Sequence, residues 1–260
     1  MDFSIKIYDS LLSSLRERNY NPITFYELLS NNQLKEYSHP FIILRQDVDR
    51  LPQNSLRFAE IQAKYGIKGS YYFRANRQSW DADVIRRIQD LGHEIGYHYE
   101  TMDTAQGDID IAWDQFRYNL DELRKIVEVR TICMHGSPLS KYDNKSLWKK
   151  YDYKSLGLIG EPYYDVNYSD VFYLTDTGRR WDGWKTSVRD KIPQQETWIK
   201  DGLVFHSTND IIKAVTDDRL PQKVMFTFHP QRWHDKTVPW VRELITQSIK
   251  NQVKKYFFVS

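Results

Sequence analysis

The feature that most constrains the fold is an alternation that begins after Pro40, in which short apolar runs are separated by segments with helical hydrophobic spacing. The first run covers residues 41–44, and a helical stretch from 55 to 65 follows it and stops at Gly66. Strands that alternate with helices favour parallel strands joined by right-handed crossovers. The other strands expected from this pattern cover residues 69–73, 94–97, 130–134, 155–159, 171–174, 203–205 and 224–228.

Two helical patterns precede this alternation. Apolar residues recur at helical spacing between residues 8 and 15, and Thr24-Phe25-Tyr26-Glu27 has the arrangement of a capping box. The sequence contains no linker, repeat or low-complexity segment. We therefore expect one α/β barrel domain over residues 1–260, with residues 1–40 as an N-terminal helical extension packed on it.

Composition and charge restrict the classes of partner. Lys and Arg (37) nearly balance Asp and Glu (35), so the net charge of +2 gives no reason to expect nucleic acid or an anionic membrane as the main partner. The single cysteine, Cys133, excludes an internal disulfide. No transmembrane run and no signal peptide are visible, so a cytoplasmic protein is expected. The oligomeric state is left open.

Polar side chains follow most of the expected strands. Asp47 and Asp49 come after the first strand, His98 ends the third, His135 follows the fourth and His229 follows the last. In a parallel barrel the carboxyl ends of all strands open on one face, and that face holds the active site. One histidine after a strand is usually structural, whereas several acids and histidines in equivalent places indicate a functional site.

The Asp47 and Asp49 pair allows two interpretations. Residues two apart on an extended backbone project to the same side, where two carboxylates repel unless a cation or a shared proton relieves them. A divalent cation held by Asp49 and an imidazole would leave Asp47 free as a general base. The alternative is an Asx-turn in which Asp49 caps the next segment, and the pair alone does not separate the two.

The order of these motifs resembles the polysaccharide deacetylase superfamily (NodB-homology, carbohydrate esterase family 4-like). The resemblance rests on Asp47-Val48-Asp49, on Gly92-His93-Glu94-Ile95-Gly96-Tyr97-His98 and on the late strand that ends in His229, and it extends over most of the chain. The chain is most similar to divergent members associated with O-antigen and other surface-polysaccharide gene clusters. The resemblance implies an irregular (β/α)7-type barrel of parallel strands with extra N-terminal helices.

The resemblance also implies roles for single residues. Asp47 matches the general base, Asp49 and His98 match two ligands of a divalent metal, with zinc favoured, and His229 matches the histidine that protonates the leaving group. The position of the family's second metal-binding histidine is Met102, and a thioether is a poor ligand for the metals of hydrolytic sites.

The third metal ligand must therefore come from elsewhere in the chain. Glu100 projects to the side of His98 if the strand continues, and His135 follows the neighbouring strand. We favour His135, because it lies in a motif where the family has an arginine that orients the base. The absence of that arginine leaves the orientation of Asp47 unexplained.

The remaining candidates are expected to contact substrate. Arg180 and Trp181 lie in a polar loop at residues 179–185, and the alternative there is a solvated loop with a packed tryptophan. For His206 the alternative to substrate contact is a structural histidine, and the sequence favours neither strongly. The set consists of Glu100, Arg74, Asp176, Arg180, Trp181 and His206.

The function that follows is metal-dependent removal of an N-acetyl or similar acyl group from a saccharide, in the biosynthesis of a surface polysaccharide. Two alternatives remain open. The first is hydrolysis of another non-peptide C–N bond, with or without a metal. The second is a degenerate barrel that binds a saccharide without catalysis.

Overall fold

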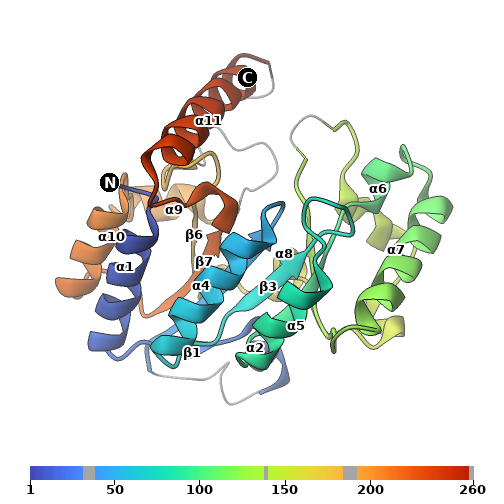
Figure 1. Cartoon of the computed structure of the whole chain (residues 1–260), viewed down its shortest axis with the longest axis horizontal. Coiled ribbons are helices and arrows are strands. Elements are labelled where there is room, and N and C mark those ends of the chain that lie inside the picture. Colours follow the sequence, from blue (N-terminus) through green and yellow to red (C-terminus); the bar gives the residue numbers. More distant parts are fainter. Residues whose placement is uncertain (32–38, 138–139, 184–191, 258–260) are drawn as a thin grey trace.

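The computed structural model describes residues 1–31, 39–137, 140–183 and 192–257, so residues 184–185 of the expected tryptophan-rich loop lie outside it. A 7-stranded sheet lies at its centre, with the order β5-β4-β3-β2-β7-β6 and with β1 beside β2 (Figure 1). The strands are β1 (Asn21–Ile23), β2 (Phe41–Val48), β3 (Ser70–Phe73), β4 (Glu94–Tyr99), β5 (Ile132–Met134), β6 (Phe172–Thr175) and β7 (Lys223–Phe228).

Every pair of neighbouring strands is parallel, and the sheet curls into a half-barrel surrounded by helices. This confirms the predicted irregular barrel of alternating strands and helices. The longer helices are α1 (Ile5–Glu17), α4 (Pro52–Lys64), α5 (Ala82–Asp90), α7 (Ile109–Arg124), α10 (Thr208–Thr216) and α11 (Thr237–Phe257). The short ones are α2 (Phe25–Ser30), α6 (Thr101–Thr104), α8 (Pro162–Asp165), α9 (Gln195–Lys200) and the 3-10 helices η1 (Asn144–Lys149), η2 (Tyr153–Leu156) and η4 (Pro230–Arg232).

Local signals set several helix ends. The Thr24 hydroxyl accepts a hydrogen bond from the Glu27 backbone N–H, and the Glu27 carboxylate accepts one from the Thr24 N–H, which completes the predicted capping box of α2. Asp81 caps α5 by accepting from two backbone N–H groups. Gly66, just after α4, has a φ of 64°, a conformation that glycine adopts without strain.

The N-terminal segment differs from a purely helical extension. Residues 21–23 form β1, which pairs with the first half of β2 in the register Asn21 to Phe41. The strand is only three residues long and contains Pro22, which lacks a backbone N–H, so the sequence carries no clear strand signal there. The N-terminal segment therefore contributes to the sheet as well as packing on it.

Two expected strands do not form. Residues 155–159 fall partly in η2, and beyond it only an isolated bridge between Thr131 and Gly160 is made. Residues 203–205 have no strand pairing, and the Phe205 side chain is buried against Phe172. In both segments the apolar residues mark burial in the core, because short apolar runs do not by themselves distinguish a strand from a packed loop.

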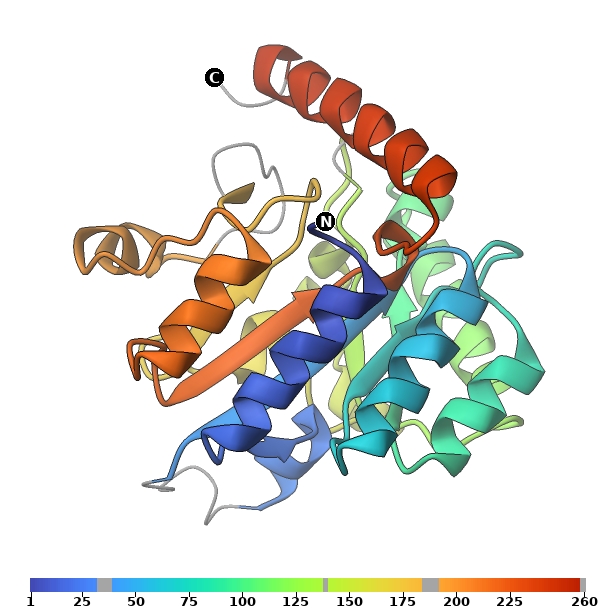
Figure 2. The same ribbon diagram turned by 60° about the vertical axis from the view of Figure 1, so that its left-hand side comes forward.

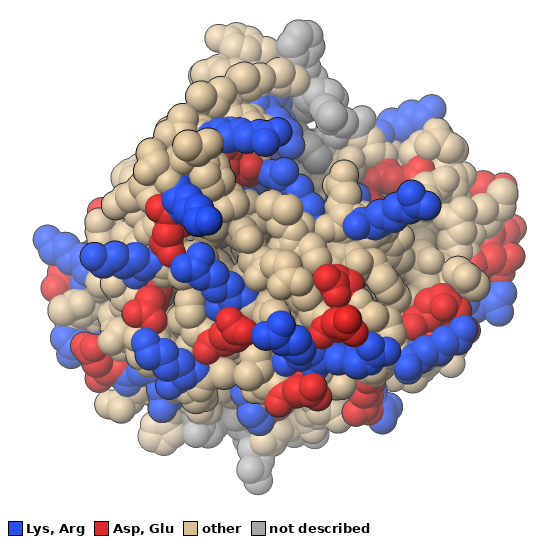
Figure 3. Space-filling model, viewed as in Figure 1, with Lys and Arg blue, Asp and Glu red and all other residues tan. Residues whose placement is uncertain are grey.

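Aromatic residues fill much of the core. Tyr8 of α1, Phe58 of α4, Phe228 of β7 and Trp233 pack with ring centroids 3.9 to 6.1 Å apart. Burying rings of this size contributes strongly to stability. Aromatic residues make up 15% of the chain, and many of them are buried in the core. On the face shown in Figure 3, Lys and Arg side chains are interspersed with Asp and Glu.

Helix α11 lies over the carboxyl ends of the strands. Figure 2 shows α11 lying across the top, above the end of β7. Several apolar residues of this helix are exposed, among them Val238, Ile245 and Ile249. Within the described ranges, no helix is both long enough and apolar enough to cross a membrane.

Candidate active site

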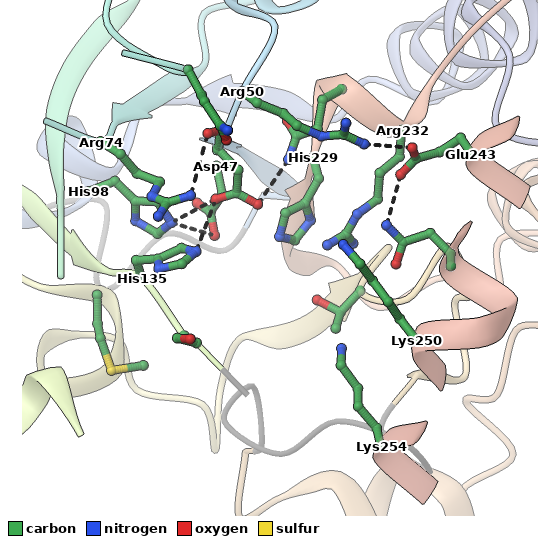
Figure 4. Close-up of a pocket in the computed structure, with 18 of the residues that line it drawn as sticks. Asp47, Arg50, Arg74, His98, His135, His229, Arg232, Glu243, Lys250 and Lys254 are labelled. Atoms are coloured by element: carbon green, nitrogen blue, oxygen red, sulfur yellow. Dashed lines mark hydrogen bonds and ion pairs between the residues drawn. The ribbon is translucent and has the colours of Figure 1, made fainter. Parts of the chain in front are cut away.

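A cavity of about 510 Å³ lies at the carboxyl ends of the strands, with α11 forming one wall (Figure 4). Six of the predicted site residues line it together: Asp47, Asp49, Arg74, His98, His135 and His229. They come from segments far apart in the chain. They meet because the register of β4 and β5 pairs His98 with Cys133, which places His135 beside the end of β4.

Asp49, His98 and His135 point their polar atoms at one another. The Oδ1 atom of Asp49 is 3.6 Å from Nε2 of His98 and 3.5 Å from Nε2 of His135. This oxygen is buried and has no hydrogen-bond partner among the described residues. A buried carboxylate oxygen without a partner is costly, so the arrangement favours a cation between the three atoms.

The outer atoms of the same three residues are held by neighbours. Gln231 Nε2 donates to Asp49 Oδ2 at 2.9 Å, and His98 Nδ1 is 2.9 Å from the carbonyl oxygen of Cys133. Since a carbonyl only accepts, Nδ1 of His98 carries the proton and Nε2 offers its lone pair to the site. His135 Nδ1 lies 3.2 Å from Glu100 Oε2. Such outer contacts orient metal-binding side chains.

A second group, Asp47, His98 and Cys133, also lies close enough for a metal ion. The Asp47 carboxylate is already paired with Arg45, and the Cys133 thiol is fully buried in β5. The thiol also donates to the Met134 carbonyl oxygen. The Asp49 group is therefore the better candidate, because its inner oxygen has no hydrogen-bond partner in the part of the chain that the structure describes.

Asp47 is held by Arg45, a residue that the sequence analysis did not identify. Arg45 Nε donates to Oδ1 at 2.9 Å and Nη2 donates to Oδ2 at 2.8 Å, and both side chains are buried. Burial raises the pKa of Asp47, but the charges of Arg45, His98 and His229 outweigh it and hold the pKa below its usual value. Arg45 thus provides the orientation of Asp47 that no arginine in the His135 motif supplies. The available signal was an arginine two positions before Asp47, directly after the apolar run of residues 41–44.

His229 is positioned by Asp176, which is fully buried. Nδ1 of His229 is 2.5 Å from Asp176 Oδ1, and the second oxygen of Asp176 accepts from Trp233 Nε1 at 2.7 Å. Arg232 Nη1 is 3.2 Å from Asp176 Oδ1. Burial raises the pKa of Asp176, but the charge and hydrogen bonds of His229 and the charge of Arg232 lower it overall. Asp176 therefore acts through His229 and does not line the cavity.

Glu100 is held by Arg74 and Asn76 and does not itself line the cavity. Arg74 donates to both oxygens of Glu100, and Asn76 donates to one of them. Burial raises the pKa of Glu100, but the neighbouring His135 and Arg74 side chains outweigh burial and lower it to about 2. Glu100 therefore supports His135 from behind, while Arg74 reaches the cavity wall.

The other predicted substrate contacts lie elsewhere. Trp181 is buried, stacks on Phe3 and donates to Thr208 Oγ1 at 3.0 Å, so it offers no free face to a sugar. Arg180 pairs with Asp182, and the exposed His206 lies 3.3 Å from the same carboxylate, away from the cavity. Trp181 and His206 therefore fit the alternatives given for them in the sequence analysis, a packed tryptophan and a structural histidine.

Met102 does not take part in the site. It lies in α6, is buried and does not line the cavity. The second imidazole beside Asp49 is that of His135. The cavity wall formed by α11, including Glu243, Lys250 and Lys254, was not foreseen either, because α11 reaches the site only through the tertiary fold.

No family model and no curated protein matches this chain. Solved structures do resemble it. One, from Bacillus anthracis, is BA3943, described as a CE4 family pseudoenzyme (TM-score 0.46, 13% identity, 83% of this chain and 61% of that chain). Another is the Streptococcus pyogenes deacetylase PplD in complex with acetate (0.44, 17%, 55% and 66%). A third is PdaA of Bacillus subtilis, described as a family 4 carbohydrate esterase (0.40, 15%, 92% and 82%). The chain thus spans less than two thirds of the length of the first of these structures.

Proposed function

We propose that this protein is a metal-dependent hydrolase that removes an N-acetyl or similar acyl group from a saccharide. The observation that carries the proposal is the buried Oδ1 atom of Asp49, which faces two imidazole nitrogens and has no hydrogen-bond partner among the described residues. Asp47, a carboxylate suited to act as a base, lies beside this group, with Oδ2 3.9 Å from His98 Nε2.

The donor set fits a divalent metal, and zinc in particular. One carboxylate oxygen and two imidazole nitrogens are three protein ligands of the kind found in catalytic zinc sites, where a further position stays open. The residues that would hold the ion are Asp49, His98 and His135. A bound divalent ion supplies a Lewis acid that polarises a carbonyl oxygen and makes water more acidic.

The protein's own residues would divide the remaining work. Asp47 is ionised at neutral pH because its pKa is lowered, so it can accept the proton of the attacking water. Its orientation is fixed by Arg45. His229, held by Asp176, lines the same cavity and would give a proton to the departing nitrogen.

The cavity also bears on the biological setting. A volume of about 510 Å³ is in the range of sites for small molecules, and it suits a saccharide of few units. We therefore propose that the substrate is a saccharide intermediate, as in the biosynthesis of a surface polysaccharide.

Metal binding and acyl release test the proposal together. We expect the protein to bind Zn²⁺ with one ion per chain. Asp49→Asn should weaken binding by more than about tenfold, since loss of a residue that only orients a ligand already costs about 10–100-fold. Acetate release from N-acetylated saccharides should require the metal. Asp47→Asn should abolish release and leave metal binding within a few-fold.

The control is His206→Gln, since His206 is exposed and away from the cavity. This variant should bind zinc and release acetate as the unaltered protein does. A protein that binds no divalent metal, or an Asp47→Asn variant that keeps its activity, would overturn the proposal.

A further inference from the structure

Helix α11 brings two lysines to the cavity wall that the proposed reaction does not use. Lys250 and Lys254 are four residues apart, so they lie on the same side of the helix, one above the other. Figure 4 shows both side chains extending from α11 into the cavity, on the side of His229 away from Asp47 and His98. The wall is therefore cationic where it faces away from the metal ligands.

The arginines of the cavity wall are already paired with carboxylates. Arg45 pairs with Asp47, Arg50 with Glu243, Arg74 with Glu100 and Arg232 with Asp176. Lys250, in contrast, has no ion pair with any carboxylate in the described part of the chain.

Glu243, the acidic residue of α11 nearest in sequence to Lys250, forms hydrogen bonds with other residues. Arg50 donates to Oε2 of Glu243 at 2.6 Å, and Gln247 donates to Oε1 at 2.8 Å. Both oxygens of Glu243 are thus engaged, and Glu243 is buried. The positive charge of Lys250 therefore remains available to a ligand in the cavity.

Arg232 extends the same cationic region toward His229. Its Nη1 atom donates to the carbonyl and carboxylate oxygens of Asp176, and no hydrogen bond among the described residues uses Nη2. Arg232 lines the cavity together with Lys250 and Lys254. A guanidinium fixed on one side by a buried acid is well placed to bind an anion with its other side.

We infer that this wall, formed by Arg232, Lys250 and Lys254, binds a phosphoryl group carried by the saccharide substrate. A phosphate carries more charge than a carboxylate and directs its oxygens to several sides, so it can meet two ammonium groups and a guanidinium together. Ile249 and Val253, each next to one of these lysines in α11, also line the cavity and would give the phosphoryl group an apolar flank.

This inference rests on the proposed function and names its substrate class. The acyl group would lie at the Asp49, His98 and His135 end of the cavity, and the phosphoryl group at the α11 end. The phosphoryl group could belong to a nucleotide-linked sugar or to a lipid-linked sugar, since both present the same chemistry.

Direct binding tests the inference without requiring catalysis. The probes for isothermal titration are N-acetylglucosamine 1-phosphate, neutral N-acetylglucosamine and N-acetylmuramic acid, which carries a carboxylate. We expect the phosphorylated probe to bind at least about tenfold more tightly than either of the others, with an affinity that falls as salt is raised. Equal affinities, or tighter binding of the carboxylate, would overturn the inference.

Variants of α11 locate the site. Lys250→Gln with Lys254→Gln should reduce the affinity for the phosphorylated probe about tenfold and leave that for the neutral sugar unchanged. Arg242→Gln is the matched control, because Arg242 is exposed on the same helix and does not line the cavity. If the double variant kept its preference for the phosphorylated probe, or if Arg242→Gln lost it, the assignment to this wall would be wrong.

Two further arms identify the source of the phosphoryl group. Tighter binding of UDP-N-acetylglucosamine than of the 1-phosphate supports a nucleotide-linked substrate, and cosedimentation with vesicles that contain polyprenyl phosphate supports a lipid-linked one. If the proposed function is wrong but the phosphoryl site is real, binding and catalysis will give different results. In that case the phosphorylated probe binds with the expected preference, but no acyl group is released from any substrate.

Discussion

Arg45 binds both carboxylate oxygens of Asp47 from a position two residues earlier on the same strand. Their side chains project to the same side of β2 because the strand has a period of two. Both are buried, so each charge depends on the other for compensation.

The Arg45–Asp47 pair can be tested by stability. Arg45→Met should lower the free energy of unfolding by about 3–5 kcal/mol, because it leaves a buried carboxylate without its partner. Arg45→Met combined with Asp47→Leu should recover much of this loss, since both charges are then removed. Urea unfolding of the metal-free proteins measures the difference. Asp47→Leu alone completes the cycle, and if the losses of the two single variants simply add in the double variant, the two residues are not coupled.

Glu100 should tune metal affinity through His135. Glu100→Gln is expected to weaken zinc binding by about 10–100-fold, the usual effect of removing a carboxylate behind a ligating histidine. His135→Gln should weaken it at least as much. Competition with a zinc-binding dye measures both.

A substitution at Met102 tests whether His135, and not residue 102, is the metal ligand. Because Met102 lies in α6 and does not line the cavity, Met102→His should not restore the zinc affinity of His135→Gln. Full restoration would mean that position 102 reaches the metal and that His135 is not the ligand.

Asp176 should control the activity of His229. Asp176→Asn is expected to lower kcat for acyl release by about 100-fold or more, because His229 loses the charge that orients and stabilises its imidazole. The KM should change little. Trp233→Phe removes a single hydrogen bond to Asp176 and leaves the contact with His229, so its effect on kcat should be much smaller. Equal effects of the two substitutions would argue against a role for this histidine.

His93 should make stability depend on pH. Its Nδ1 atom accepts the Gly69 backbone N–H at 3.0 Å, so Nε2 carries the proton and donates to the Ala59 carbonyl oxygen at 3.0 Å. Burial, assisted by the charge of Lys68, lowers the pKa of His93 to about 4, although the hydrogen bond to Ala59 opposes the shift. The folded protein therefore holds His93 neutral at a pH where the unfolded chain binds a proton.

Stability from this residue is fully present above the unfolded pKa of 6.5 and falls as the pH decreases toward 4. Between pH 7 and pH 5 the free energy of unfolding should drop by about 2 kcal/mol more in the unaltered protein than in His93→Gln. Urea unfolding at the two pH values gives both numbers. The same pH dependence in both proteins would assign it to other groups.

Much of the fold followed from local patterns. The helix caps at Thr24 and Asp81 are set by side chains that bond to nearby backbone groups, and the alternating apolar runs predicted six of the seven strands. The errors arose in short segments. The apolar runs at 155–159 and 203–205 were predicted as strands but reflect burial without strand pairing. The β1 strand was missed because it is only three residues long and contains Pro22.

The residue types at the strand ends could be read from the amino-acid sequence, because a strand's limits and the side chains that follow it are local properties. The sequence placed Asp47, Asp49, His98, His135 and His229 on one face. The tertiary structure decided which of them touch. The pairing of β4 with β5 puts His135 at Asp49 with Glu100 behind it, and the path of α11 brings Lys250 to the cavity. These contacts join segments far apart in the chain, so their distances are set by strand register and helix packing, which spacing along the sequence does not encode.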